Sequence, residues 1–99
     1  MKIVAVTACP TGIAHTFMAA EQLEKTARRL GHEIKVETQG SMGIENELSQ
    51  ADVDAAGVAI LACDIVIEKM ERFERIRKIE VSPQDAIKNP GAVVTSACS

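Results

Sequence analysis

The residues best placed to do chemistry belong to the short stretch around Cys9. An apolar run over residues 3–6 has the composition of a buried strand, and a helical pattern begins near Thr16. A thiol between the end of a strand and the start of a helix faces unpaired backbone N–H groups and the positive end of the helix dipole. Such surroundings lower the pKa of a thiol and also suit a bound phosphate. We therefore expect a loop that activates the Cys9 sulfur and holds a phosphoryl group on it.

The residue types that follow Cys9 fit this chemistry. Gly12 lets the backbone approach a ligand closely, and Thr11 and Thr16 offer hydroxyl donors. Phosphoryl transfer depends mainly on positioning and on stabilising charge, so a loop of donors with one nucleophile is sufficient. His15 has two interpretations that the sequence leaves open: it donates to the phosphoryl group, or it is a first-turn helix residue that faces solvent.

Other residues that could do chemistry have simpler interpretations. Three cysteines without a Cys-x-x-Cys spacing argue against a disulfide framework or a zinc site, and we expect Cys63 and Cys98 to pack as small hydrophobic residues. His32, beside a glycine, is expected at the surface, and Glu45 and Glu47 are expected to diverge on a solvated face. Two histidines and scattered carboxylates show no ligand spacing, so we expect no metal and no cofactor.

The composition limits the class of protein. A chain of 99 residues that is 46% hydrophobic fits one domain, residues 1–99. Its net charge of −3 and its only two aromatic residues, Phe17 and Phe73, argue against nucleic-acid binding. No apolar stretch has the length of a membrane span or the form of a signal peptide. We therefore expect a cytoplasmic protein that is not inserted in a membrane.

Strands and helices are expected to alternate along the chain. The patterns predict strands over 2–7, 33–38, 58–62 and 77–81, and helices over 16–30, 49–56 and 70–73. A last helix is expected from Ser82, with Pro83 at its first position and Asn89 near its end. Residues 39–43 are expected to form a loop and 44–48 a helical turn. The patterns leave open whether 65–67 extend a strand, and whether the tail over 89–99 is ordered.

This alternation predicts an α/β fold. We expect a four-stranded parallel sheet with helices on both faces, a Rossmann-like three-layer sandwich. Right-handed crossovers place the loops after the strands at one edge of such a sheet, where ligands bind. The Cys9 loop, the loop over 40–43 and Asp64 should therefore lie together.

Several segments resemble a known family. Residues 3–21, Ile-Val-Ala-Val-Thr-Ala-Cys-Pro-Thr-Gly-Ile-Ala-His-Thr-Phe-Met-Ala-Ala-Glu, are similar to the opening of fructose-type enzyme IIB domains. These domains belong to the bacterial phosphoenolpyruvate-dependent sugar phosphotransferase system (PTS). Residues 35–48 resemble the second segment of that family, and 58–64 and 71–73 lie where it has its third strand and a following motif. The match over 65–78 is looser.

The resemblance implies a specific function. Cys9 would form a phosphocysteine, accepting a phosphoryl group from a phosphohistidine on enzyme IIA. It would pass that group to fructose or a fructose-like sugar bound by the membrane enzyme IIC, so the chain would be a phosphotransferase and a single type-2 EIIB domain. The implied phosphate-binding residues are Pro10, Thr11, Gly12, Ile13, Ala14, His15 and Thr16.

Two alternatives compete with this interpretation. Cysteine phosphatases of the low-molecular-weight tyrosine type also place Cys after the first strand, in a Cys-x5-Arg loop. Here the sixth residue after Cys9 is His15, and the guanidinium that clamps the transition state is missing. The second alternative is a regulatory module that only senses phosphorylation. Nothing basic in this chain would contact DNA, so that role would require another domain.

Overall fold

The core of the molecule is one five-stranded sheet. The computed structural model describes residues 1–8, 13–40 and 43–98. The strands lie in the order β3-β2-β1-β4-β5; β2, β1, β4 and β5 run parallel, and β3 runs antiparallel to β2. The strands are β1 Lys2–Ala8, β2 Glu33–Gly40, β3 Gly43–Glu45, β4 Val58–Cys63 and β5 Lys78–Val81.

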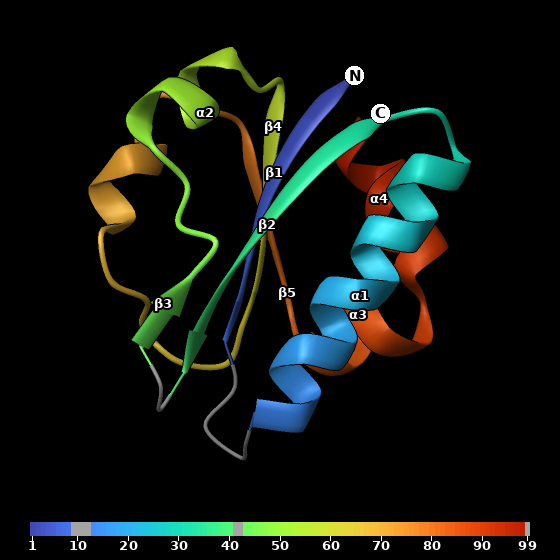
Figure 1. Ribbon diagram of the computed structural model, residues 1–99. Coiled ribbons are helices and arrows are strands. Elements are labelled where there is room, and N and C mark those ends of the chain that lie inside the picture. Colours follow the sequence, from blue (N-terminus) through green and yellow to red (C-terminus); the bar gives the residue numbers. More distant parts are fainter. Residues whose placement is uncertain (9–12, 41–42, 99) are drawn as a thin grey trace.

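Helices cover both faces of this sheet. One face carries α1 (Ile13–Arg29), α3 (Pro83–Lys88) and α4 (Pro90–Cys98), and the other carries α2 (Gln50–Ala55) and the 3-10 helix η1 (Met70–Phe73) (Figure 1). The α/β class and the three layers that the sequence predicted are confirmed.

The apolar run of β1 explains why the sheet is buried on both sides. Ile3 and Ala5 pack into the cluster under α1, whereas Val4 and Val6 pack into the cluster under α2 and η1. A strand whose two faces are both covered has no polar alternation, so its sequence is continuously apolar. Cys63 and Cys98 pack against these clusters, as the sequence suggested.

Three expectations about local structure are wrong. The sheet has five strands, because Gly43–Glu45 pairs antiparallel with the end of β2. For the same reason residues 44–48 do not form a helical turn: Asn46, in the left-handed region at φ 53°, leads the chain away from β3. The helix after Ser82 is also not the last one, since α4 follows it directly.

The helix start signals, in contrast, are confirmed. Ser49 caps α2 in a capping box in which its hydroxyl accepts from the N–H of Asp52 and the Asp52 carboxylate accepts from the N–H of Ser49. Ser82 caps α3 in the same position, with its hydroxyl accepting from the N–H of Asp85. These contacts satisfy backbone donors that helix geometry leaves unpaired.

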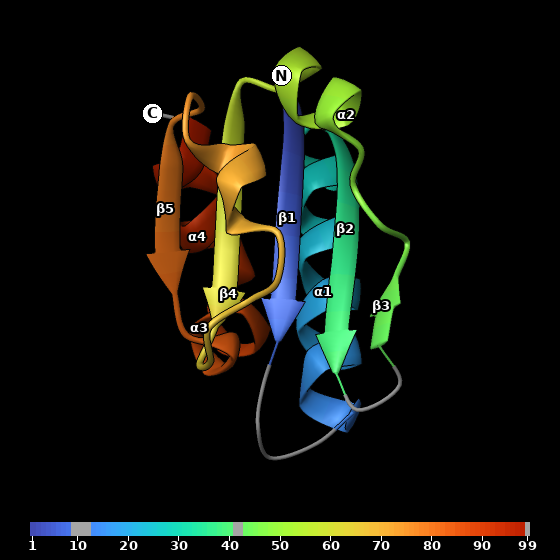
Figure 2. The ribbon, with the colours of Figure 1, turned by 90° about the vertical axis from the view of Figure 1, so that its left-hand side faces the viewer.

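The ends of three strands meet at one edge of the sheet. Ala8, the last residue of β1, lies in register with Gln39 on β2 and with Cys63 on β4. The N–H of Asp64 donates to the carbonyl of Ala8 at 3.1 Å. Figure 2 shows β1, β2 and β4 pointing to this common edge, which we call the carboxyl edge.

Candidate functional site

The described part of the Cys9 loop consists of its two borders. Ala8 ends β1, and Ile13 begins α1. Cys9, Pro10, Thr11 and Gly12 lie outside the described residues. Of the other predicted phosphate-binding residues, Ile13 and Ala14 contribute the first turn of α1, His15 is exposed on that helix, and Thr16 is buried.

Thr7 and Thr16 connect the end of β1 to the start of α1. The Thr7 hydroxyl donates to the carbonyl of Thr16 at 3.0 Å, and both side chains are buried. The Thr16 hydroxyl oxygen has no hydrogen-bond partner among the described residues, although the side chain is only 3% exposed. Leaving a buried hydroxyl unpaired costs about 1–3 kcal/mol. A hydroxyl in the first turn of α1, close to the carboxyl edge, is therefore left without a partner among the described residues.

Behind this edge lies a buried ion pair between β2 and η1. Glu37 is fully buried, and its two carboxylate oxygens accept four hydrogen bonds. Two come from the guanidinium of Arg72, at 2.7 and 3.0 Å, one from the side-chain amide of Gln39 at 2.7 Å, and one from the N–H of Leu48 at 2.8 Å. Every lone-pair position of the carboxylate thus faces a donor.

Arg72 is equally well satisfied. Besides its two bonds to Glu37, it donates from Nη1 to the carbonyl of Leu48 at 2.7 Å and from Nε to that of Lys69 at 2.8 Å. A longer contact of 3.4 Å joins Nη2 to the carbonyl of Glu68. The five N–H groups of the guanidinium therefore all have acceptors. One side chain ties the segments before α2 and before η1 to β2.

The hydrogen bonds decide the charge of Glu37. Burial raises the pKa of its carboxyl, but the hydrogen bonds from Arg72, Gln39 and Leu48 outweigh burial, and the pKa lies below its ordinary value. The hydrogen bond to Glu37 raises the pKa of Arg72 more than burial lowers it. Both groups are therefore charged at neutral pH, as a charge-assisted bidentate pair.

No sequence motif predicted a role for Glu37, Gln39 or Arg72. One signal could have indicated these residues: Glu37 and Gln39, both polar, occupy alternate positions of one strand. Strand residues two apart face the same side, so a partner had to lie there. The partner is separated from Glu37 by 35 residues, which no local pattern reveals.

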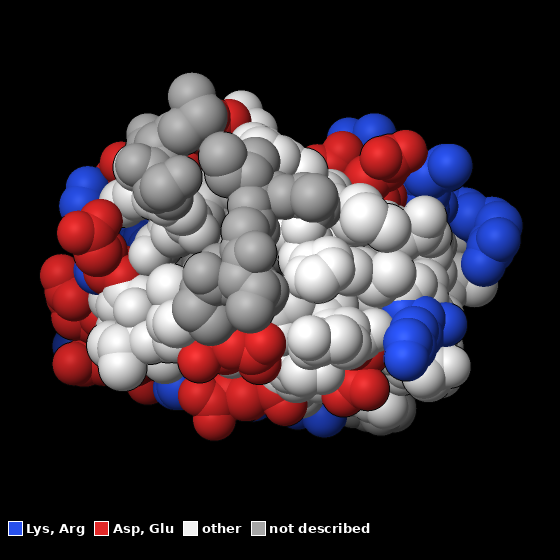
Figure 3. Space-filling view, turned by 90° about the horizontal axis from the view of Figure 1, so that it is seen from below, with Lys and Arg blue, Asp and Glu red and all other residues white. Residues whose placement is uncertain are grey.

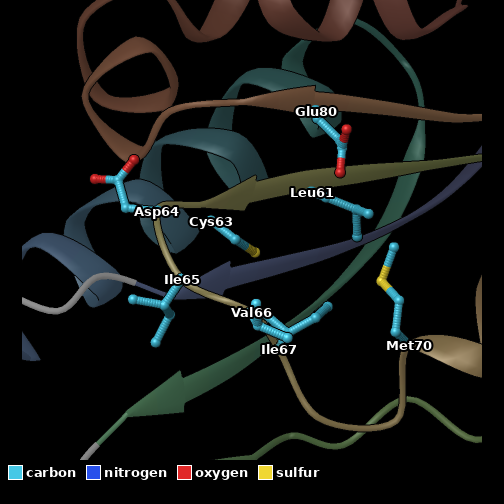
Figure 4. A pocket seen from close by; sticks show the side chains of 8 residues that line it. All are labelled: Leu61, Cys63, Asp64, Ile65, Val66, Ile67, Met70 and Glu80. Atoms are coloured by element: carbon cyan, nitrogen blue, oxygen red, sulfur yellow. The ribbon is translucent and has the colours of Figure 1, made fainter.

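A pocket of about 370 Å³ opens at the carboxyl edge beside β4. It is mostly apolar, with two carboxylates, Asp64 and Glu80, among its lining (Figure 4). Cys63 also lines it, and its Sγ donates to the carbonyl of Val6 at 3.4 Å. Burial, and to a smaller extent nearby carboxylates, raises the pKa of the Cys63 thiol to about 12. The described lining contains no Lys or Arg, so it does not suit a phosphate.

The surface of the carboxyl edge is largely uncharged. Figure 3 shows this edge from below: uncharged side chains extend beside the grey atoms, and acidic and basic side chains lie around the margin. Four large hydrophobic residues near the carboxyl edge are exposed. Phe17 and Met18 lie close to the start of α1, and Ile65 and Val66 follow the end of β4. Among the described residues no cluster of three or more His, Cys, Asp or Glu could hold a metal ion. No helix in this part of the chain is long and apolar enough to cross a membrane.

Sequence comparisons place this α/β domain in a family. The profile described as "PTS system, Lactose/Cellobiose specific IIB subunit" matches residues 4–96. The PTS system fructose-like EIIB component 2 of Escherichia coli K12 is 52% identical over 94 residues, 95% of this chain and 89% of that protein. The fructose-specific EIIABC component of Bacillus subtilis is 49% identical over 97% of this chain, which spans 15% of that longer protein.

Solved structures agree with the sequence comparisons. A domain of the fructose-specific IIABC component of Borrelia burgdorferi superposes with a TM-score of 0.92 at 48% identity, covering 97% of this chain and 91% of that one. The enzyme IIB subunit of a PTS system from Escherichia coli K12 gives a TM-score of 0.90 at 44% identity, covering 96% of this chain and 88% of that one.

The chain therefore belongs to the IIB family of the sugar phosphotransferase system. Its role is phosphoryl transfer in sugar uptake, and it is a phosphotransferase component. The resemblance on which the sequence analysis relied is confirmed.

Proposed function

We propose that Cys9 carries the phosphoryl group as a phosphocysteine. In the first step the Cys9 thiolate attacks the phosphorus of a phosphohistidine on enzyme IIA. The S–P bond forms as the P–N bond breaks, and the imidazole keeps the electron pair and takes up a proton. In the second step a sugar hydroxyl on the membrane enzyme IIC attacks the same phosphorus. The S–P bond breaks, the thiolate is regenerated, and the hydroxyl proton is released to a base or to water.

The observation that carries this proposal is the unpaired hydroxyl of Thr16 in the first turn of α1. It lies at the carboxyl edge, one helical turn from the Cys9 loop, and no described residue uses it. Backbone N–H groups of the first turn and the helix dipole add to it. Pro10 through Thr16 would then surround a dianionic phosphoryl group on the sulfur. His15, exposed on the same turn, is a further candidate donor.

The names of relatives support the proposed donor and acceptor. Relatives named EIIABC and EIIB'BC join the EIIB unit in one protein to the units that their names indicate, which supports transfer between an A unit, a B unit and a C unit. Several relatives are named fructose-like or fructose-specific, so fructose or a similar sugar is the proposed acceptor. Residues 1–99 would act as a single EIIB domain on the cytoplasmic side of the membrane.

Replacing Cys9 tests the proposal directly. Cys9→Ser keeps the size of the side chain but removes the thiolate, and it should abolish sugar phosphorylation in a system that supplies phosphoenolpyruvate, the general PTS proteins, IIA and IIC. The matched controls Cys63→Ser and Cys98→Ser should keep the transfer rate near that of the parent chain. Relay by a folded Cys9→Ser protein at the parent rate would overturn the proposal.

A further inference from the structure

The chain after β4 forms a short segment, residues 64–69, that begins beside Ala8 at the end of β1. The segment begins with Asp64, whose N–H donates to the carbonyl of Ala8, the residue directly before Cys9. Its next two residues are apolar and exposed: Ile65 is 42% exposed, and Val66 is 97% exposed. Ile67 turns back into the core and is buried. A valine that is this exposed, between the anchored residues Asp64 and Ile67, needs an explanation, because no described residue covers it.

Gln39 holds the other end of this segment. Its side-chain Oε1 accepts from the N–H of Glu68 at 2.8 Å, and its Nε2 donates to the carbonyl of the same residue at 3.2 Å. The amide thus pairs with both backbone groups of Glu68, as a neighbouring strand would. A third bond, from Nε2 to the Glu37 carboxylate at 2.7 Å, fixes which amide atom faces which partner.

The Glu37–Arg72 pair supports this arrangement from behind. Glu37 holds the amide of Gln39, while Arg72 donates to the carbonyls of Lys69 and, more weakly, Glu68. Lys69 occupies the left-handed region at φ 59°, an uncommon conformation for a residue with a side chain, where the segment turns into η1. Four partly buried hydrogen bonds, two that Gln39 makes with Glu68 and two that Arg72 donates to Glu68 and Lys69, therefore set the path of a segment whose apolar tip, Ile65 and Val66, is exposed.

We propose that Gln39 is a positioning residue for phosphoryl exchange. It holds residues 64–69 so that Ile65 and Val66 form an apolar contact for the phosphohistidine-bearing enzyme IIA, and this inference rests on the proposed function of Cys9. Any donor must bring its phosphohistidine to the sulfur one residue after Ala8, and Asp64 is bonded to Ala8. Asp64 precedes the apolar tip formed by Ile65 and Val66, and Glu68 follows it after the buried Ile67. Both carboxylates are exposed, so the proposed IIA surface has an apolar centre with basic residues around it.

The experiment measures the initial rate of phosphoryl transfer to this chain from the phosphorylated IIA unit of the Bacillus subtilis EIIABC component, as a function of chain concentration. Val66→Ala should raise KM at least about fivefold, the effect of losing a contact worth about 1 kcal/mol. Gln39→Met, which fills the same space without hydrogen bonds, should raise KM similarly, with kcat within about twofold of the parent. In the double variant Gln39→Met, Val66→Ala, KM should rise no further, because Gln39 acts through the placement of the tip.

Gln50→Met is the matched control. Its side-chain amide donates to the carbonyl of Arg72 at 3.2 Å, but it begins α2, away from the carboxyl edge. This variant should leave KM unchanged. If Gln39→Met fails to fold, Gln39→Asn, which keeps a neutral amide on a side chain one methylene shorter, takes its place in the cycle.

The outcomes separate the two proposals. A parent chain that is not phosphorylated by the donor would overturn the proposed function and this inference with it. A phosphorylated parent with an unchanged KM for Val66→Ala, or with Gln39→Met lowering only stability, would overturn this inference alone. It would also be overturned if the increases in KM caused by Gln39→Met and Val66→Ala multiplied in the double variant, as independent effects do. If Val66→Ala slowed phosphoryl transfer to the IIC-bound sugar but not from IIA, the apolar tip would contact IIC, which would contradict the proposed contact with IIA.

Discussion

The guanidinium of Arg72 and the carboxylate of Glu37 face each other in a bidentate ion pair that is almost fully withdrawn from solvent. The Nη1–Oε1 and Nη2–Oε2 distances are 2.7 and 3.0 Å, and the two side chains are 8% and 0% exposed. The pair joins β2 to η1 and fixes the segments on either side of it. Through this pair, residues far apart in the sequence hold together the segments next to the carboxyl edge.

Removing one partner of this pair should cost more than removing both. Arg72→Met leaves a buried carboxylate without its counter-charge, and we expect the free energy of unfolding to fall by about 3–5 kcal/mol. Adding Glu37→Leu should restore part of that loss, because the double variant buries no unpaired charge. Urea denaturation of the single and double variants measures the coupling. Strictly additive losses would show that the pair is not coupled.

The same pair predicts acid sensitivity. Because the pKa of Glu37 is lower in the folded chain than its ordinary value of 4.5, the unfolded chain binds the proton at higher pH. The stabilisation is fully present above that ordinary value and is lost as the pH falls through the folded pKa. Asp52, whose hydrogen bond from Lys35 lowers its pKa to about 2, contributes in the same direction.

Thermal denaturation between neutral pH and pH 2 measures this dependence. We expect the melting temperature to fall steadily below about pH 4.5, the ordinary value for Glu37. The fall should be shallower for Glu37→Gln, which no longer titrates at this position. Equal slopes for the parent and the variant would contradict the assignment.

Thr16 offers a prediction in which stability and activity change in opposite directions. Thr16→Val removes a buried hydroxyl that has no partner among the described residues, so the folded chain should be as stable as the parent or slightly more stable. Phosphoryl acceptance from IIA should slow by about tenfold, because a hydrogen bond to a charged group is lost. Thr26→Val, at another buried threonine of α1, is the control and should not slow it.

A faster or unchanged rate for Thr16→Val would remove Thr16 from the phosphate-binding loop. A large loss of stability would show that its hydroxyl serves the fold.

Cys63 should be chemically inert despite its place at the carboxyl edge. With its pKa raised from 9.0 to about 12, its thiolate fraction near neutral pH is about a thousandfold smaller than that of an ordinary thiol. Alkylation with iodoacetamide at pH 8, followed by peptide mapping, should modify Cys9 long before Cys63. Modification of Cys63 at a rate similar to that of Cys9 would contradict the burial argument.

Local patterns predicted most of the framework, whereas the phosphate-binding site around Cys9 stays a prediction. The β1–α1–β2 unit follows from an apolar run, a helical period and a glycine C-cap at Gly31, and these signals lie within single elements. The three-residue strand β3 is too short for any period, and its existence depends on pairing with β2. The role of Gln39 depends on Glu68 and Arg72, which only the folded chain brings near β2.

The measurement closest to the central claim is the location of the phosphoryl group. The chain is incubated with phosphoenolpyruvate, the general PTS proteins and IIA, and the modified residue is mapped by mass spectrometry under conditions that preserve thiophosphate esters. We expect one phosphoryl group, on Cys9, which disappears when IIC and sugar are added. A phosphoryl group on His15 or elsewhere, or steady hydrolysis of an aryl phosphate without IIA or IIC, would contradict the phosphocysteine relay.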